Sequence, residues 1–226
     1  MKKSLLIICF GFGLLSAIPD PQKTTLPKGF VYLSHVVPNI VVELRYFSKE
    51  NFVAKRVNGY KKEVAIISEP AAFALSKVQI ELNKRHLRLK VFDAYRPQKA
   101  VDHFVRWAKN MTDTTHKHIY YPEVDKADLF KLDYIASKSG HTRGSTIDVT
   151  LVDSENLELD MGTPWDFFGT KSWPSDTTIS KVAQQNRTYL REVMLAHGFV
   201  PYEKEWWHFT LKNEPFPDTY FDFNVK

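Results

Sequence analysis

The chain has 226 residues and a formal net charge of +5, with its lysines and arginines scattered rather than gathered into tracts, so it carries no nucleic-acid-binding signature. Its single cysteine, Cys9, leaves no pair for a disulfide and no thiolates for a structural zinc cage, so any metal must be held by His, Asp or Glu. Roughly 200 residues follow the N-terminal leader, which is enough for one well-buried core, and no repeat or linker divides them.

The N-terminus has the features of a secretory signal peptide over residues 1–17. Lys2 and Lys3 are followed by an apolar run over 5–15 and then by the small residues Ser16 and Ala17. Because the run is too short to span a bilayer, we expect cleavage, a periplasmic or secreted protein, and no stable membrane insertion afterwards. Residues 18–29 contain three prolines and are expected as an unstructured arm, with a single domain over 30–226.

Hydrophobic periodicity predicts strands and helices in a mixed order along the chain. Apolar residues at helical spacing predict helices over 69–86, about 101–108 and 179–197, whereas β-rich or alternating stretches predict strands over 40–47, 87–95, 145–152 and 206–211. Residues 112–125 are predicted as a polar and aromatic loop. This order favours an α+β fold, which is one compact domain with an antiparallel sheet and flanking helices.

The strand predicted over 145–152 contains a carboxylate whose side chain points away from the core. Its apolar residues occupy the odd positions from 147 to 151, so Asp148 points to the opposite face. His141 precedes Asp148 by seven positions. We therefore expect Asp148 to face a functional site.

A second segment, Glu205-Trp206-Trp207-His208, adds another histidine and a glutamate. Together with His141 and Asp148 it supplies two imidazoles, one carboxylate ligand and one spare carboxylate. This is the inventory of a hydrolytic zinc site with an open fourth position. The sequence therefore predicts a zinc peptidase with one zinc ion per chain.

The spacing of Glu205 and His208 does not fit a regular strand if both side chains belong to one site. Glu205 and His208 are three residues apart, so a regular strand would place them on opposite faces. A helix would bring them together, but Trp-Trp-His-Phe-Thr is poor helix material. We therefore expect a strand entry or bulge near Glu205 that lets both side chains reach one centre.

Several segments share their residues and their order with one known family: 92–97, 139–151, Met161-Gly162 with Asp166-Phe167, 205–209 and the ending 220–226. In these segments the chain resembles the zinc D-alanyl-D-alanine dipeptidases of the vancomycin-resistance type. The resemblance covers nearly all of residues 30–226 in the same order. It implies a compact α+β domain shared with other D-Ala-D-Ala metallopeptidases, the lysostaphin-type peptidases and the hedgehog signalling domain.

The resemblance implies catalytic roles residue by residue. His141, Asp148 and His208 match the zinc ligands of the family. Glu205 matches its catalytic base, which would take a proton from the attacking water and give it to the leaving amine. Arg96 matches the arginine beside the scissile carbonyl, where a permanent positive charge would stabilise the oxyanion.

The same resemblance implies a binding site for a small dipeptide. Asp166 and Tyr46 match the groups that bind the free amine of the substrate, and Ser139 matches a residue that helps to hold its carboxylate. Two such ends set the length of the substrate. The expected reaction is the hydrolysis of D-alanyl-D-alanine to two D-alanines.

Two other interpretations use the same motifs. An exported cell-wall D,D-carboxypeptidase or endopeptidase would share the metal centre, and Asp166 argues for the dipeptidase instead. A catalytically silent zinc-binding module would need neither Glu205 nor Arg96, and both are present. Because an exported enzyme cannot reach precursors in the cytoplasm, we expect D-alanine scavenging or wall turnover as its role.

Overall fold

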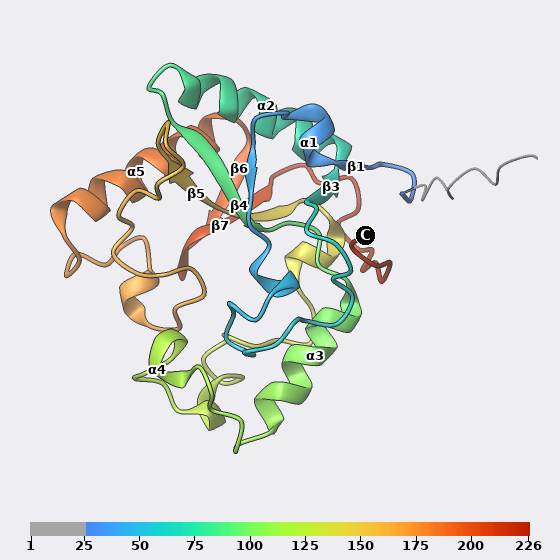
Figure 1. The fold of residues 1–226 in the computed structure, drawn as a ribbon, viewed down its shortest axis with the longest axis vertical. Coiled ribbons are helices and arrows are strands. Elements are labelled where there is room, and N and C mark those ends of the chain that lie inside the picture. Colours follow the sequence, from blue (N-terminus) through green and yellow to red (C-terminus); the bar gives the residue numbers. More distant parts are fainter. Residues whose placement is uncertain (1–25) are drawn as a thin grey trace, which may run out of the picture.

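A five-stranded sheet forms the centre of the computed structural model, which describes residues 26–226 (Figure 1). Its strand order is β2-β4-β5-β7-β6, and a two-stranded sheet pairs β1 with β3. The strands are β1 Phe30–Tyr32, β2 Val41–Val42, β3 Ile66–Ser68, β4 Arg88–Asp93, β5 Thr146–Val152, β6 Phe199–Tyr202 and β7 Glu205–Leu211. The signal peptide predicted over 1–17 and most of the predicted arm lie outside the described residues.

The longer helices begin where local sequence favours a helix start. A proline stands in the first turn of α2, and the Ser180 hydroxyl accepts a hydrogen bond from the backbone N–H of Ala183 at the start of α5. Gly198, at a φ of 87°, follows the end of α5, where a left-handed residue commonly terminates a helix. The helices are α1 Leu33–Val36, α2 Glu69–Asn83, α3 Gln98–Lys109, α4 Lys117–Tyr120 and α5 Lys181–Ala196.

The two longest helices pack on the sheet and on each other. α2 contacts β4, and α5 contacts β5, β6 and β7. In Figure 1 both lie in the upper part of the molecule, whereas α3 and α4 lie in the lower part. Ile147, Val149 and Leu151 are fully buried in the hydrophobic core. The alternation predicted for this strand is therefore confirmed, and Asp148 points away from these three residues.

One row of cross-strand partners positions the site. Asp93 on β4 is opposite Asp148 on β5, and Asp148 is opposite His208 on β7. Side chains of directly opposite residues share a face of the sheet. A register irregularity between Val91 and Asp93 brings Asp93 into this row. The sheet therefore gathers two carboxylates and one imidazole side by side.

The predicted α+β class is confirmed, with three corrections of detail. The sheet is mixed, because β2 runs parallel to β4. The strand predicted over 40–47 shrinks to Val41–Val42, since the chain turns into a 3₁₀ segment at Arg45–Phe47 that buries Tyr46 among aromatic rings. The loop predicted over 112–125 contains the short helix α4. Strands β1, β3 and β6 were not predicted, because three or four residues show too little periodicity.

The C-terminal segment runs back to the start of α3 and to the segment that carries His141. The backbone N–H of Phe221 donates to the Thr142 carbonyl, and the Phe221 carbonyl accepts from the N–H of Gln98. The ring of Phe223 stacks on Tyr95 with centroids 4.0 Å apart. This tail thus braces both segments that lead into the site.

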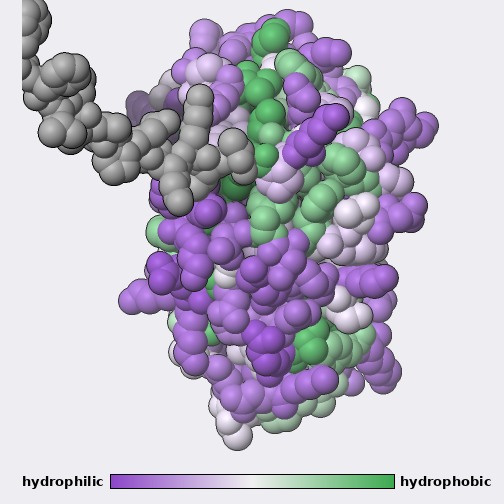
Figure 2. All heavy atoms as spheres, turned by 90° about the vertical axis from the view of Figure 1, so that its right-hand side faces the viewer, coloured by the Kyte–Doolittle hydropathy of each residue, from purple (hydrophilic) through white to green (hydrophobic). Residues whose placement is uncertain are grey.

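The exposed surface is largely hydrophilic on the face shown in Figure 2, where hydrophobic residues gather mainly toward the top. Within the described part of the chain, no helix is long and apolar enough to cross a membrane.

Candidate active site

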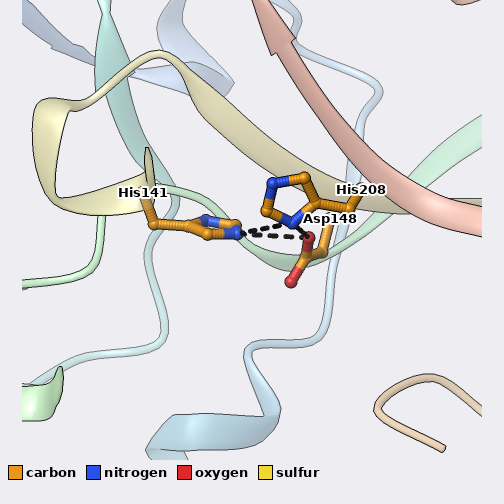
Figure 3. A group of neighbouring side chains, drawn as sticks. All are labelled: His141, Asp148 and His208. Carbon is orange, nitrogen blue, oxygen red and sulfur yellow. Dashed lines mark hydrogen bonds and ion pairs between the residues drawn. The ribbon is translucent and has the colours of Figure 1, made fainter. Parts of the chain in front are cut away.

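Three side chains from separate segments converge on one point (Figure 3). His141 lies in the 3₁₀ turn Gly140–Arg143, Asp148 on β5 and His208 on β7. Nε2 of His141 is 3.3 Å from Nδ1 of His208 and 3.2 Å from Oδ1 of Asp148, and the remaining pair is 3.1 Å apart. Ligand atoms of a tetrahedral zinc ion, each about 2.0–2.1 Å from the metal, lie roughly 3.3 Å from one another. The spacing therefore fits a zinc ion.

The hydrogen bonding of His141 supports the same assignment. Its Nδ1 lies 2.7 Å from the carbonyl oxygen of Ala94, and because a carbonyl only accepts, Nδ1 donates. In the neutral ring, Nε2 then turns its lone pair toward Oδ1 of Asp148. Among the described residues that buried oxygen has no hydrogen-bond donor. An anionic oxygen facing the Nε2 lone pair of His141 is unfavourable without a cation between them, so the residues fit a metal ion.

The electrostatics of the cluster also favour positive charge. Burial acts to raise the pKa of Asp148, but His141 and His208 outweigh it and hold that pKa well below its usual range. Burial acts to lower the pKa of His208, yet its contacts with Asp148 and Glu205 raise that pKa to about 9. The carboxylates therefore stabilise a cation at this point.

The predicted irregularity near Glu205 is confirmed. On β6 the partners change from Pro201 opposite Phe209 to Tyr202 opposite Glu205, so residues 206–208 are extra on β7. This arrangement brings Oε2 of Glu205 to 3.3 Å from Nδ1 of His208. Glu205 is half-buried and stands outside the three-residue cluster, so it is a carboxylate beside the candidate metal site rather than part of it.

Arg96 is held beside the same cluster by Asp93, a carboxylate to which the sequence motifs give no role. Nε of Arg96 donates to Oδ2 of the fully buried Asp93 at 2.8 Å, and the hydroxyl of Tyr60 donates to Oδ1 at 2.6 Å. Nη2 of Arg96 is 3.8 Å from Oδ2 of Asp148. By the alternation of 87, 89 and 91, position 93 would face the core, so a carboxylate at this position was a sign of a special role, although the register shift that turns it toward Asp148 has no sequence signal.

Asp166 is a buried carboxylate without a cationic partner. It is 6% exposed, and its Oδ2 accepts a hydrogen bond of 2.7 Å from the hydroxyl of Tyr46. Within residues 26–226 no Lys, Arg or His side chain forms an ion pair with it. Burial and the nearby charge of Asp148 raise the pKa of Asp166 well above its ordinary value, although the Tyr46 bond opposes the shift. A cationic ligand would satisfy this group.

Ser139 stands at the entrance of the His141 turn. Its hydroxyl accepts a hydrogen bond of 3.3 Å from the backbone N–H of His141. This bond leaves the hydroxyl hydrogen free to donate to a ligand. The side chain therefore has a structural role in the turn and also borders the site.

One cavity of about 200 Å³ joins these groups. This volume is below the roughly 300–1,000 Å³ typical of sites for drug-sized ligands, so it suits a small molecule. Apolar walls come from rings such as Phe52, Phe104 and Phe168. All the predicted site residues except His141 line the cavity: Tyr46, Arg96, Ser139, Asp148, Asp166, Glu205 and His208.

Comparison with known proteins agrees with this geometry. A family model described as D-ala-D-ala dipeptidase matches residues 27–226. The chain belongs to this family. The D-Ala-D-Ala dipeptidase family is a family of peptidases, so the chain is an enzyme of that class, and the resemblance found in its motifs is confirmed.

Two relatives named D-alanyl-D-alanine dipeptidase match over almost their whole length. A D-alanyl-D-alanine dipeptidase of Enterococcus faecalis is 39% identical over 201 residues, covering 88% of this chain and 100% of the relative. A D-alanyl-D-alanine dipeptidase of Streptomyces coelicolor is 37% identical over 197 residues, covering 87% and 98%. Among solved structures, a zinc complex of the vancomycin resistance D,D-pentapeptidase VanY is a distant neighbour, with 14% identity, coverage of 70% and 78%, and a TM-score of 0.41.

Proposed function

We propose that this dipeptidase-family member hydrolyses D-alanyl-D-alanine to two D-alanines with one zinc ion held by His141, Asp148 and His208. The observation that carries the proposal is the set of side chains that line one small cavity. It has a ligand cluster with the spacing of a zinc site at one wall and the buried, unpaired Asp166 at another. Family membership and the names of the relatives support the same substrate.

Glu205 accepts and returns the proton during the reaction. Zinc bound in such a site lowers the pKa of water to about 7 and polarises a carbonyl. Glu205 lies beside the ligands without belonging to them, so its carboxylate is free to accept a proton from the attacking water. As the C–N bond of the peptide breaks, Glu205 returns that proton to the leaving amine, and the products are two amino acids.

Arg96 stabilises the charge that develops on the carbonyl oxygen. Its Nε donates to Asp93, which orients the planar guanidinium, and Arg96 lines the cavity. The rings of Tyr46 and Phe104 lie within 5.0 Å and 5.2 Å of its central carbon and exclude water from that side. Removing a preorganised donor of this kind typically costs about 2.7–4 kcal/mol in transition-state stabilisation.

The ends of the substrate are recognised by opposite charges and hydrogen bonds. Asp166, oriented by the Tyr46 hydroxyl, binds the free ammonium group, and Ser139 donates to the terminal carboxylate. A substrate with a blocked or extended N-terminus brings no cation to Asp166. Leaving that carboxylate buried and unpaired costs on the order of 3–5 kcal/mol, which selects for dipeptides.

We also propose that the enzyme is exported and acts outside the cytoplasm, in D-alanine scavenging or wall turnover. The support is the sequence alone, namely the charged start, the apolar run over 5–15 and the small residues after it. Cell fractionation with N-terminal sequencing tests this proposal. A full-length protein that begins at Met1 and stays in the cytoplasm would contradict it.

The substrate proposal is tested with the purified mature protein. D-Ala-D-Ala, N-acetyl-D-Ala-D-Ala and a wall pentapeptide are compared with and without a chelator, followed by restoration with zinc. We expect rapid cleavage of the free dipeptide only, loss of activity with chelator and recovery with zinc. Equal rates on the blocked or longer peptides would instead identify a carboxypeptidase, and no cleavage by zinc-loaded protein would identify a silent zinc-binding module.

A further inference from the structure

The second oxygen of Asp148 has a donor that the proposed mechanism does not use. Oδ1 faces the two histidines, whereas Oδ2 accepts a hydrogen bond of 3.2 Å from the indole Nε1 of Trp165. Both side chains are almost completely buried. Arg96 is the nearest cation to this oxygen, at 3.8 Å, which is beyond hydrogen-bond distance. The indole is therefore the direct donor to Oδ2 among the described residues.

We propose that Trp165 is a positioning residue for the metal centre, whose indole N–H holds Oδ2 of Asp148 so that Oδ1 alone is presented to the metal. This inference rests on the proposed role of Asp148 as a zinc ligand. A carboxylate attached by one rotatable bond can turn and offer either oxygen or both. A single donor on one oxygen removes that freedom, and donors to metal-binding carboxylates typically contribute 10- to 100-fold in metal affinity.

The indole is itself held in place by ring packing. Its centroid lies 4.9 Å from that of Tyr46 and 5.5 Å from that of Phe92. Tyr46 also holds Asp166, the next residue along the chain from Trp165. Neighbouring side chains of an extended chain point in opposite directions, but Asp166 has a φ of 59°, so the left-handed turn lets residues 165 and 166 both reach the site.

The loop that carries Trp165 is tied to helix α5 by a buried arginine. Arg187 is 3% exposed and donates to the carbonyl of Met161 at 2.7 Å, to the carbonyl of Trp173 at 3.1 Å and to the hydroxyl of Thr163 at 3.3 Å. These bonds fix the loop on both sides of Trp165. The donor to Asp148 is thus attached to the helical layer and does not depend on a free loop.

The competing explanation is that Trp165 only fills space in the core. Trp165→Phe distinguishes the two, because it keeps an aromatic ring between Tyr46 and Phe92 and removes the N–H. Trp207→Phe is a matched control, since Trp207 is equally buried and its Nε1 has no hydrogen-bond partner among the described residues. Zinc affinity of the full mature protein is measured by competition with a chromophoric chelator, and folding is checked by circular dichroism.

We expect Trp165→Phe to bind zinc about tenfold more weakly, at the lower end of the usual range because Arg96 remains near Oδ2. Trp207→Phe should stay within about twofold of the wild type, since it loses ring volume without a hydrogen bond. After cobalt substitution, the visible absorption of Trp165→Phe should also shift as the carboxylate gains freedom to bind through both oxygens. A core-filling role would leave this spectrum unchanged.

Zinc affinity of Trp165→Phe within twofold of the wild type, with an unchanged cobalt spectrum, would overturn the inference. So would an equal loss in the Trp207→Phe control. Should Trp165→Phe not fold, site-specific replacement of Trp165 by 3-benzothienylalanine keeps the bicyclic shape with sulfur in place of the N–H, and the same tenfold loss is expected. If the wild-type protein itself binds no zinc, the proposed function fails, which is a different result from failure of this inference.

Discussion

Replacing Asp166 by asparagine tests the origin of dipeptide selectivity most directly. The amide has nearly the same shape as the carboxylate and can still accept the hydrogen bond from Tyr46, so the change removes charge with little change in packing. Loss of one partner of a buried, hydrogen-bonded charge pair costs about 2–5 kcal/mol, which corresponds to about 30- to 5,000-fold. The 6% exposure of Asp166 favours the upper part of this range, but the amide oxygen still accepts from the ammonium.

We therefore expect kcat/KM for D-Ala-D-Ala to fall about 100- to 1,000-fold in Asp166→Asn. The rate on N-acetyl-D-Ala-D-Ala should change little, because that substrate has no ammonium to lose. The assay is steady-state release of D-alanine from both substrates at equal zinc content. A fall smaller than about tenfold, or an equal fall on both substrates, would refute the assignment of Asp166 to the amine.

The same variant has an opposite effect on the stability of the substrate-free protein. Burial raises the pKa of Asp166 in the folded state above its unfolded value of about 3.9, so folding is disfavoured wherever the unfolded carboxylate is ionised. Asparagine removes this penalty. At pH 7 the Tm of metal-free Asp166→Asn should exceed that of the metal-free wild type, and the difference should shrink as the pH falls below about 4. A lower Tm at pH 7 would contradict this account.

Three further changes test other parts of the site. Glu205→Gln should keep one zinc by metal analysis while kcat falls about 10²- to 10⁴-fold, and loss of metal in proportion to activity would make Glu205 a ligand. Arg96→Lys should lower kcat severely because a point charge cannot replace the fork held by Asp93, whereas a change confined to KM would assign Arg96 to binding. Removal of residues 220–226 takes away the packing of Phe223 on Tyr95 and should lower the free energy of unfolding by about 3 kcal/mol, which corresponds to a fall in Tm of about 6–12 °C. An unchanged Tm and kcat would show that the tail does not support the segments that lead into the site.

Much of the site could be predicted from the sequence because its chemistry is local. The alternation of apolar residues around Asp148 showed that its side chain leaves the core, since side-chain direction in a strand follows from position alone. The spacing of Glu205 and His208 even required an irregular strand, and the extra residues 206–208 provide it. Residue type and strand geometry sufficed for these inferences.

The tertiary structure decided the groups that act through distant contacts. Asp93 joins the row of Asp148 and His208 only because β4 shifts register after Val91, and no local pattern encodes a shift that depends on the neighbouring strand. From the sequence alone, Trp165 cannot be distinguished from other aromatic residues of the core. Only the structure shows that its Nε1 lies 3.2 Å from Oδ2 of Asp148.

The segment that carries Tyr46 shows the same division. Residues 40–47 have the composition of a strand, and the local preference alone predicts one. The observed strand ends at Val42, and the Tyr46 ring instead packs against Phe104 and Trp165 while its hydroxyl bonds Asp166. Burial of a large aromatic side chain outweighs a β preference that spans only about 1 kcal/mol. The sequence therefore indicated which residues belong to the site, whereas packing between distant segments decided how they are arranged.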